Sequence, residues 1–305
     1  MISKLKYLFN RFILYLKQGD IKKIFYKFFL TLFGNNKIDL DKLYFQNDTN
    51  LDELFLRFGS DKGKYDGKKT YDYLILDKNV KFKNYEEWIK RENLHDFEYQ
   101  LGHDFSNIYE EIFKNFKDKE INFLEIGVAN GHSIASWYKY FSNATINGID
   151  IKKSDKLFYK GKRLNYHSVD CFNQKQVDTY LKGNKKFDVI IDDSSHIYEA
   201  YFYNIKNFYK NVKNGGIYIL EDFRISDLER KLIQKFNQEN QATFLQRDKY
   251  TVEQIFNFIS KKEKFKHHIF TSNDIDLLFN STKESKIINT EHPAGTVAIL
   301  IKNSL

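Results

Sequence analysis

The first 37 residues carry apolar side chains at helical spacing. Between residues 4 and 33, leucine, isoleucine and phenylalanine recur at intervals of three and four positions, which is the period of an amphipathic helix. Gly19-Asp20 interrupts the pattern and Gly34 follows it, so two helices are predicted. Neither holds the roughly 18 to 20 uninterrupted apolar residues of a membrane span, and the interspersed basic residues argue against a signal peptide.

From residue 121 onward, short apolar runs alternate with stretches of helical period. This alternation predicts an α/β fold with a Rossmann-like, doubly wound and mostly parallel sheet. The predicted strands are Ile121–Ile126, Thr145–Ile151, Leu164–Val169, Phe187–Asp192 and Ile217–Leu220, the last preceded by a turn at Asn214-Gly-Gly216. The predicted helices cover about 133–141, 173–182, 197–211, 226–239 and 251–260. Near the end, His267–Thr271 and Thr296–Ile301 are strand-like and Ile275–Phe279 is ambiguous, which predicts a closing antiparallel strand.

The same pattern divides the chain into an arm and one domain. Residues 1–50 form the predicted basic, amphipathic helical arm, and residues 51–305 form the predicted domain. Within the domain, a cap or lid region at 51–116 would precede a Rossmann-like core at 117–305. A stretch at 66–100 is rich in lysine, tyrosine and aspartate, and we interpret it as an insertion that forms a lid or part of the substrate wall.

Composition narrows the cellular context. A chain of 305 residues can bury a full core, and a hydrophobic content of 42% excludes wholesale disorder. The single cysteine, Cys171, excludes an internal disulfide framework and a cysteine-based zinc site. These features fit a reducing compartment, so a cytoplasmic location is expected.

Charge sets the arm apart from the rest of the chain. The net charge is +8, and residues 1–37 contribute +7 of it, with eight lysines or arginines against one aspartate. The remainder is nearly neutral and gives no sign of a basic face, so nucleic acid is not an expected partner. Two interpretations of the arm stay open. It packs on the domain or on a second subunit of a homo-oligomer, or it makes a peripheral contact with the anionic inner face of a membrane.

Residues 121–133 carry the first chemical signal. A strand leads into Glu125, two glycines four positions apart follow at Gly127 and Gly131, and a helix is expected from about Ser133. The spacing differs from the Gly-x-Gly-x-x-Gly of dinucleotide sites, and no P-loop sequence is present. An acid at this strand end would repel a phosphate, so the turn suits a cationic or hydroxyl-rich ligand.

Acids also follow the next two predicted strands. Asp150 could accept both hydroxyls of a ribose, as the corresponding acid does in NAD-binding folds, and Asp170 could receive the amino group of an adenine. Three acids at successive strand ends, with a glycine turn and no pyrophosphate loop, match S-adenosylmethionine. On these residues, the segment at about 120–225 resembles the class I methyltransferases. The alternative is an unrelated α/β fold whose glycines serve packing.

The chemical centre is predicted where the two following strands end. One ends in Asp192-Asp193-Ser-Ser-His196 and the other in Glu221-Asp222, and these ends should lie side by side. Converging carboxylates need a cation, and the acids at 193, 221 and 222 offer the hard oxygen ligands that suit Mg²⁺ or Mn²⁺. His196 could then take the proton of a substrate hydroxyl that the metal acidifies.

A different interpretation of this cluster is structural. Asp192-Asp193-Ser-Ser could cap the helix expected from about Ile197. Asp192 in particular could cap that helix, support the site from behind or bind the metal. We group it with the cofactor-binding residues.

The same stretch narrows the resemblance. Asp-Asp-Ser-Ser-His followed by Gly-Gly-Ile-Tyr-Ile-Leu-Glu-Asp resembles the metal-dependent sugar O-methyltransferases that act on macrolide sugars and bacterial surface glycans. That family has Asp-Asp-Gly-Ser-His, and Ser194 replaces the glycine here. The resemblance implies that Asp193, Glu221 and Asp222 bind magnesium and that His196 is the base.

The resemblance also extends upstream of the predicted core. Gly59-Ser-Asp-Lys62 and His103-x-x-Ser-x-x-Tyr109 are similar to family elements that help to close over cofactor and substrate. It therefore implies cofactor-binding roles for Lys62, His103 and Tyr109. The alternative is ordinary surface-loop chemistry, and Lys62 is the weakest of the three because lone lysines are usually solvated. The arm and the 66–100 insertion lie outside the resemblance.

Together these signals predict an S-adenosylmethionine- and Mg²⁺-dependent O-methyltransferase. Its acceptor would be a sugar hydroxyl of a nucleotide-activated sugar or of a bacterial surface polysaccharide such as capsule or lipopolysaccharide. A catechol-like or natural-product hydroxyl is an alternative acceptor. An NAD-dependent sugar-modifying oxidoreductase is disfavoured by Glu125 and by the missing dinucleotide glycines, and a non-catalytic, membrane-attached module is disfavoured by the intact set of acids and histidine.

Overall fold

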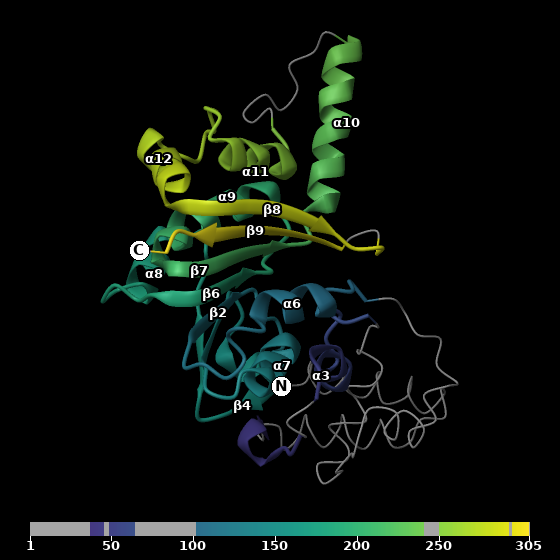
Figure 1. Ribbon diagram of the computed structural model, residues 1–305, viewed down its shortest axis with the longest axis vertical. Helices are drawn as coiled ribbons and strands as arrows, with labels where there is room; N and C mark the ends of the chain where they lie inside the picture. The colour runs from purple at the N-terminus through teal and green to yellow at the C-terminus, as the bar shows by residue number, and fades with distance from the viewer. Residues whose placement is uncertain (1–36, 46–48, 65–101, 241–249, 293–294, 305) are drawn as a thin grey trace, which may run out of the picture.

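The computed structural model describes residues 37–45, 49–64, 102–240, 250–292 and 295–304 (Figure 1). The arm expected at the amino terminus, apart from residues 37–45 and 49–50, and the insertion expected at 66–100 lie outside these residues. Within the described part of the chain, no helix combines the length and the apolar character needed to cross a membrane.

A seven-stranded sheet forms the centre of the described residues, with strand order β5-β3-β2-β6-β7-β9-β8. The first five of these strands are parallel, and β9 and β8 are antiparallel. The predicted α/β fold with a closing antiparallel strand is therefore confirmed. The strands are β2 (Asn122–Ile126), β3 (Thr145–Asp150), β5 (Leu164–Ser168), β6 (Phe187–Asp192), β7 (Val212–Glu221), β8 (Thr282–Asn289) and β9 (Thr296–Lys302).

Helices cover both faces of the sheet and bury two apolar clusters (Figure 1). Successive residues of a central strand point to opposite faces, so Phe123 joins one cluster and Leu124 the other. The first cluster contains side chains of α3 (Leu51–Phe58), α6 (Ser106–Phe113) and α7 (His132–Tyr140). The second contains side chains of α8 (Gln174–Tyr180), α9 (Tyr198–Phe208), α11 (Val252–Lys261) and α12 (Ser272–Ser281). A further helix, α10 (Arg224–Asn240), projects from the body.

Two details of the predicted elements are wrong. Asn214-Gly-Gly216 is not a turn before a strand, because β7 begins at Val212 and runs through these residues. A register shift in the β6–β7 pairing accommodates them, and Gly216 passes so close to strand β6 that an added Cβ would lie 2.7 Å from the carbonyl oxygen of Asp188.

The second error concerns the order of the last elements. The apolar run His267–Thr271 is not a strand but leads into α12, where Thr271 and Asp274 form a capping box. The ambiguous stretch Ile275–Phe279 is helical. The edge strand is instead β8, whose first residues, Thr-Lys-Glu-Ser-Lys, are polar. An edge strand tolerates such residues because its outer side is solvated, so the apolar pattern did not mark it.

Residues before the core are joined to it by backbone pairing. Short strand β1 (Ile38–Asp39) pairs in parallel with β4 (Tyr159–Lys160), and α3 packs on α7. The loops that follow α3 and precede α6 are also paired, since the amides of His103 and Phe105 donate to the carbonyl oxygens of Asp61 (2.7 Å) and Lys62 (2.8 Å). These bonds place the residues on either side of the insertion next to each other at the edge of the site. Single-turn 3-10 helices lie at Leu40–Lys42, Ser154–Lys156 and Tyr209–Asn211.

Candidate active site

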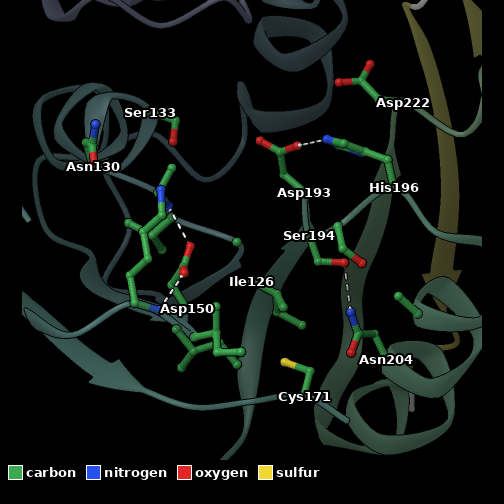
Figure 2. A pocket seen from close by; sticks show the side chains of 18 of the residues that line it. Ile126, Asn130, Ser133, Asp150, Cys171, Asp193, Ser194, His196, Asn204 and Asp222 are labelled. Carbon is green, nitrogen blue, oxygen red and sulfur yellow. Dashed lines mark hydrogen bonds and ion pairs between the residues drawn. The ribbon is translucent and has the colours of Figure 1, made fainter. Parts of the chain in front are cut away.

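A cavity of about 650 Å³ lies at the carboxyl ends of the parallel strands, where α/β sheets bind their ligands. Figure 2 shows the groups that face it. Of the residues predicted for cofactor, metal or catalysis, nine line this cavity: Lys62, His103, Gly127, Ser133, Asp150, Asp170, Asp193, His196 and Asp222. The others, Tyr109, Glu125, Gly131, Asp192 and Glu221, lie beside or beneath the lining.

One end of the cavity is built by the turn after β2. Asp150, at the end of β3, accepts hydrogen bonds from the backbone amides of Ala129 (2.7 Å) and Lys152 (2.8 Å). Ala129 has a positive φ of 51° and Gly127 one of 89°, a left-handed backbone that glycine adopts freely. The carboxylate of Asp150 is therefore held by two backbone amides at the lining of the cavity.

Gly127 also marks a close approach between the two ends of the site. A Cβ added there would lie 2.0 Å from the carbonyl oxygen of Asp193, so only glycine fits. Gly131 has a different role, since it precedes α7 with a φ of 94° and an added Cβ would meet Leu157 at 2.5 Å. Gly131 thus allows α7 to pack closely, and it does not line the cavity.

The segment after β5 adds an apolar side chain to the cavity lining that was not predicted from the sequence. Asp170 accepts a hydrogen bond from the amide of Phe172 at 3.0 Å. The Phe172 side chain lines the cavity although it is 54% exposed, and its ring contacts Tyr203 edge-on. An exposed aromatic ring beside a carboxylate suits a flat, polar-edged ring such as adenine. The available signal was a large apolar residue in the loop after the strand, two positions beyond Asp170.

Asp192 supports the site from behind. It is fully buried, accepts hydrogen bonds from Asn204 Nδ2 (3.0 Å) and the Tyr218 hydroxyl (2.8 Å), and does not line the cavity. Burial raises its pKa to about 6. It does not cap a helix, because α9 begins after Ile197 and no side-chain capping bond is found there among the described residues. Asn204, a buried polar residue of α9, was not predicted, and it also donates to Ser194 Oγ at 3.1 Å.

The other end of the cavity gathers acids and histidines. Asp193, His196 and Asp222 have ligating atoms that all lie within 4.8 Å of one another, and His196 Nε2 is 3.6 Å from Asp193 Oδ1 (Figure 2). His196 and Asp222 have positive φ angles of 55° and 58°. Left-handed backbone at non-glycine residues is costly and concentrates at functional sites.

Lys62 is the hub of this cluster. Its side chain is only 2% exposed, and its ammonium group pairs with the carboxylates of Asp193 and Glu221 and lies 3.7 Å from Glu125 Oε1. The Tyr109 hydroxyl donates to the other oxygen of the Glu221 carboxylate, Oε1. From the sequence, Lys62 is the weakest upstream candidate because lone lysines are usually solvated. In the structure this lysine is buried, and its ammonium group lies beside three acids of the predicted site.

The two histidines at this end have opposite electrostatic surroundings. Burial lowers the pKa of His196 below its usual value. Burial also acts to lower the pKa of His103, but the hydrogen bond from its Nδ1 to Asp222 (2.9 Å) and the nearby negative charge outweigh that and raise it. His196 therefore suits a neutral proton acceptor, and His103 suits a cation paired with Asp222.

The acids carry more negative charge than their described neighbours neutralise. Burial raises the pKa of Glu221 to about 7 and that of Asp193 well above its usual value, against the lowering effect of Lys62. Burial likewise raises the pKa of Glu125, partly offset by Lys62, Ser133 and Trp137. Asp222 Oδ1 is buried and has no hydrogen-bond partner among the described residues. This hard-oxygen donor set fits a divalent cation such as Mg²⁺.

Comparisons with known proteins agree with this architecture. No family model matches the chain. Over 131 residues it is 28% identical to the 8-demethyl-8-alpha-L-rhamnosyl tetracenomycin-C 2'-O-methyltransferase of Streptomyces olivaceus. This alignment covers 41% of this chain and 34% of that protein. Over 127 residues it is 28% identical to the mycinamicin VI 2''-O-methyltransferase of Micromonospora griseorubida. That alignment covers 39% of this chain and 31% of the relative. The matched segment thus spans about a third of the length of these curated relatives.

A solved structure shares the fold over most of the chain. The MycE methyltransferase from the mycinamycin biosynthetic pathway, in complex with Mg, SAH and mycinamycin VI, superposes with a TM-score of 0.52 and 17% sequence identity. The superposition covers 84% of this chain and 55% of that one. The chain therefore has the fold of the class I S-adenosylmethionine-dependent methyltransferases, and its sequence resembles the metal-dependent sugar O-methyltransferases within that class.

Proposed function

We propose that the protein is an S-adenosylmethionine- and Mg²⁺-dependent O-methyltransferase that acts on a sugar hydroxyl. The observation that carries the proposal is a single cavity with Asp150 and Asp170 at one end and Asp193, His196 and Asp222 at the other. The first pair suits the hydroxyls and amino group of a nucleoside. The second group suits a divalent cation and a proton transfer.

The chain's own residues divide the work of the reaction. When bound, S-adenosylmethionine would supply an electrophilic methyl group, and Mg²⁺ would lower the pKa of an acceptor hydroxyl. Asp193, Glu221 and Asp222 would hold the ion. Asp193 and Asp222 have carboxylate oxygens in the group of ligating atoms within 4.8 Å, and Glu221 shares Lys62 with Asp193. Asp150, fixed by two backbone amides, would orient the nucleoside.

His196 is the residue placed to accept the acceptor's proton. Its ring reaches the cavity, is 44% exposed and stands 3.6 Å from Asp193. Burial lowers the pKa of the imidazole, which favours its neutral, proton-accepting form. The pKa of His103 is raised beside Asp222, so His103 holds a proton more readily and is less suited to accept one from the substrate.

The acceptor class is argued from chemistry shared with the relatives. Two relatives are named for O-methylation of sugar-bearing natural products, and a sugar hydroxyl beside a cation is what this centre can activate. Within that class we propose a nucleotide-activated sugar or a bacterial surface polysaccharide. The +7 charge of residues 1–37 supports this choice, because a basic arm suits an acceptor made at an anionic membrane surface.

Methyl transfer to defined acceptors tests the proposal. Purified protein would be incubated with S-adenosylmethionine, Mg²⁺ and a panel of nucleotide sugars, glycosides and surface polysaccharides, and the products would be analysed by mass spectrometry. We expect one added methyl group on a sugar, loss of activity in excess EDTA and its return with Mg²⁺. Transfer that persists undiminished in EDTA would contradict the metal role. Thermal stabilisation by NAD but not by S-adenosylhomocysteine would contradict the proposed cofactor.

A further inference from the structure

Lys62 is a buried charge that the proposed mechanism does not use. Its side chain is 2% exposed, and burying an ammonium group costs several kcal/mol unless ion pairs offset it. Those pairs are present, because the ammonium contacts the carboxylates of Asp193 and Glu221 and lies 3.7 Å from Glu125. Two of its three partners are acids that we propose as metal ligands.

The position of this lysine is fixed from several directions. Its carbonyl oxygen accepts the amide of Phe105 at 2.8 Å, and its own amide donates to Ser60 Oγ at 3.3 Å. The Tyr109 hydroxyl donates to Oε1 of Glu221, whereas Lys62 binds Oε2. Lysine and carboxylates are therefore held together by separate parts of the fold.

The charges of the cluster do not balance with Lys62 alone. Four carboxylates, those of Glu125, Asp193, Glu221 and Asp222, face this lysine and His103. Asp222 is 9% exposed, and its Oδ1 has no hydrogen-bond partner among the described residues. The cluster can therefore accept a further cation, but one that binds Asp193 and Glu221 must share them with the ammonium group or displace it.

We propose that Lys62 is an internal counter-cation that holds Asp193 and Glu221 together in the metal-free protein and competes with the divalent cation for them. This inference rests on the proposed function, because it takes those acids to be metal ligands. Lys62 is thus a positioning residue. It lowers the affinity for metal, and it stabilises the protein until metal binds.

Replacing Lys62 by methionine tests the competition, because Lys62→Met removes the charge and keeps the length of the side chain. Full-length protein would be titrated with Mg²⁺ alone by calorimetry and by thermal denaturation. We expect the metal-free variant to melt below the wild type, Mg²⁺ to raise its melting temperature more than it raises that of the wild type, and Mg²⁺ to bind about tenfold more tightly. A variant that is soluble only with Mg²⁺ and unfolds in EDTA would support the proposal in the same way.

Lys302→Met is the matched control. Lys302 is also buried, but its ammonium donates to the carbonyl oxygen of Val212 at 2.8 Å, away from the acids. Its replacement should lower the melting temperature without changing the affinity for Mg²⁺. Equal or weaker Mg²⁺ binding by Lys62→Met, or equal unfolding with and without Mg²⁺, would overturn the competition while the wild type still binds the ion. A wild type that binds no Mg²⁺ would overturn the metal role and this inference together.

Discussion

The two ends of the cavity are held together in different ways. At the end that we propose for the cofactor, the cofactor end, Asp150 is bound by backbone amides 21 and two positions away in the sequence. At the end that we propose for the metal, the metal end, Lys62 pairs with Asp193 and Glu221 across 131 and 159 positions. The first end is set by the local backbone of two turns, whereas the second depends on buried charges from distant segments.

Because of this difference, we expect a substitution at one end to leave binding at the other end unchanged. A carboxylate held by backbone amides keeps its place as long as the strand ends do. A cluster of buried charges is more sensitive, because removing one member leaves another without a partner, at a cost of about 3–5 kcal/mol for a buried ion pair. The point of contact between the ends is Gly127, whose backbone passes next to that of Asp193.

The largest expected effect comes from Gly127→Ala, which should break both ends at once. The new Cβ would lie 2.0 Å from the Asp193 carbonyl oxygen at a φ of 89°, so strain and overlap should together cost about 3 kcal/mol or more. We expect lower thermal stability, weak binding of S-adenosylhomocysteine and weak binding of Mg²⁺. Gly183→Ala is the control, because Gly183 has a φ of 83° with no described atom within 4 Å of an added Cβ. It should cost only about 1–2 kcal/mol. Equal losses in the two variants would contradict the role of close approach.

His196→Ala should remove the base at the metal end while sparing the cofactor end. Loss of a general base lowers kcat by about 10²–10⁴-fold, and the affinity for S-adenosylhomocysteine should not change. His167→Ala, on β5 and outside the cavity lining, should retain full activity. Because His196 also lies within 4.8 Å of the other candidate ligands, the affinity for Mg²⁺ discriminates two roles. A parallel loss of Mg²⁺ binding would make His196 a ligand instead of the base.

Asp150→Asn should weaken the cofactor end alone. Removing the charge while keeping one acceptor oxygen costs hydrogen bonds of about 1.5–3 kcal/mol, so the dissociation constant for S-adenosylhomocysteine should rise about 10- to 100-fold. The affinity for Mg²⁺, measured without cofactor, should stay at the wild-type value. A simultaneous loss of Mg²⁺ affinity would show that the ends are coupled through more than Gly127.

Asp170→Asn should have the smallest effect. Asp170 is partly exposed and its side chain accepts the amide of Phe172, so an amide oxygen can replace it in that bond. We expect a loss of about 0.5–1.5 kcal/mol in binding of S-adenosylhomocysteine, measured by calorimetry. An effect as large as that of Asp150→Asn would contradict the ranking and assign Asp170 the dominant nucleoside contact.

The sequence predicted the strands around the proposed cofactor end well because their signals are local. Glycines, strand periodicity and an acid at a strand end lie within a few residues of one another, and strands β2, β3, β5 and β6 begin and end within two residues of the prediction. The edge strand β8 was missed because six of its eight residues are polar. Periodicity reports burial, so an element with little burial gives a weak signal.

The upstream residues show the limit of local reasoning. Lys62 carries no periodic signal, and a lone lysine is usually solvated, yet the pairing of residues 61 and 62 with 103 and 105 brings it to the strand ends. Asn204 is similar, because only the packing of α9 shows that its amide binds Asp192 and Ser194. Both side chains gain their roles from contacts between distant segments.

By itself, the sequence determined the α/β architecture, the glycine turn and the set of acids and histidine that end the strands. Tertiary structure decided which of these groups share one cavity, which support it from behind, and which cation already stands among the acids. The physical reason is the distance along the sequence over which each property is set. Backbone conformation and periodicity are set by neighbouring residues, whereas the burial and pairing of charge depend on segments more than a hundred positions apart.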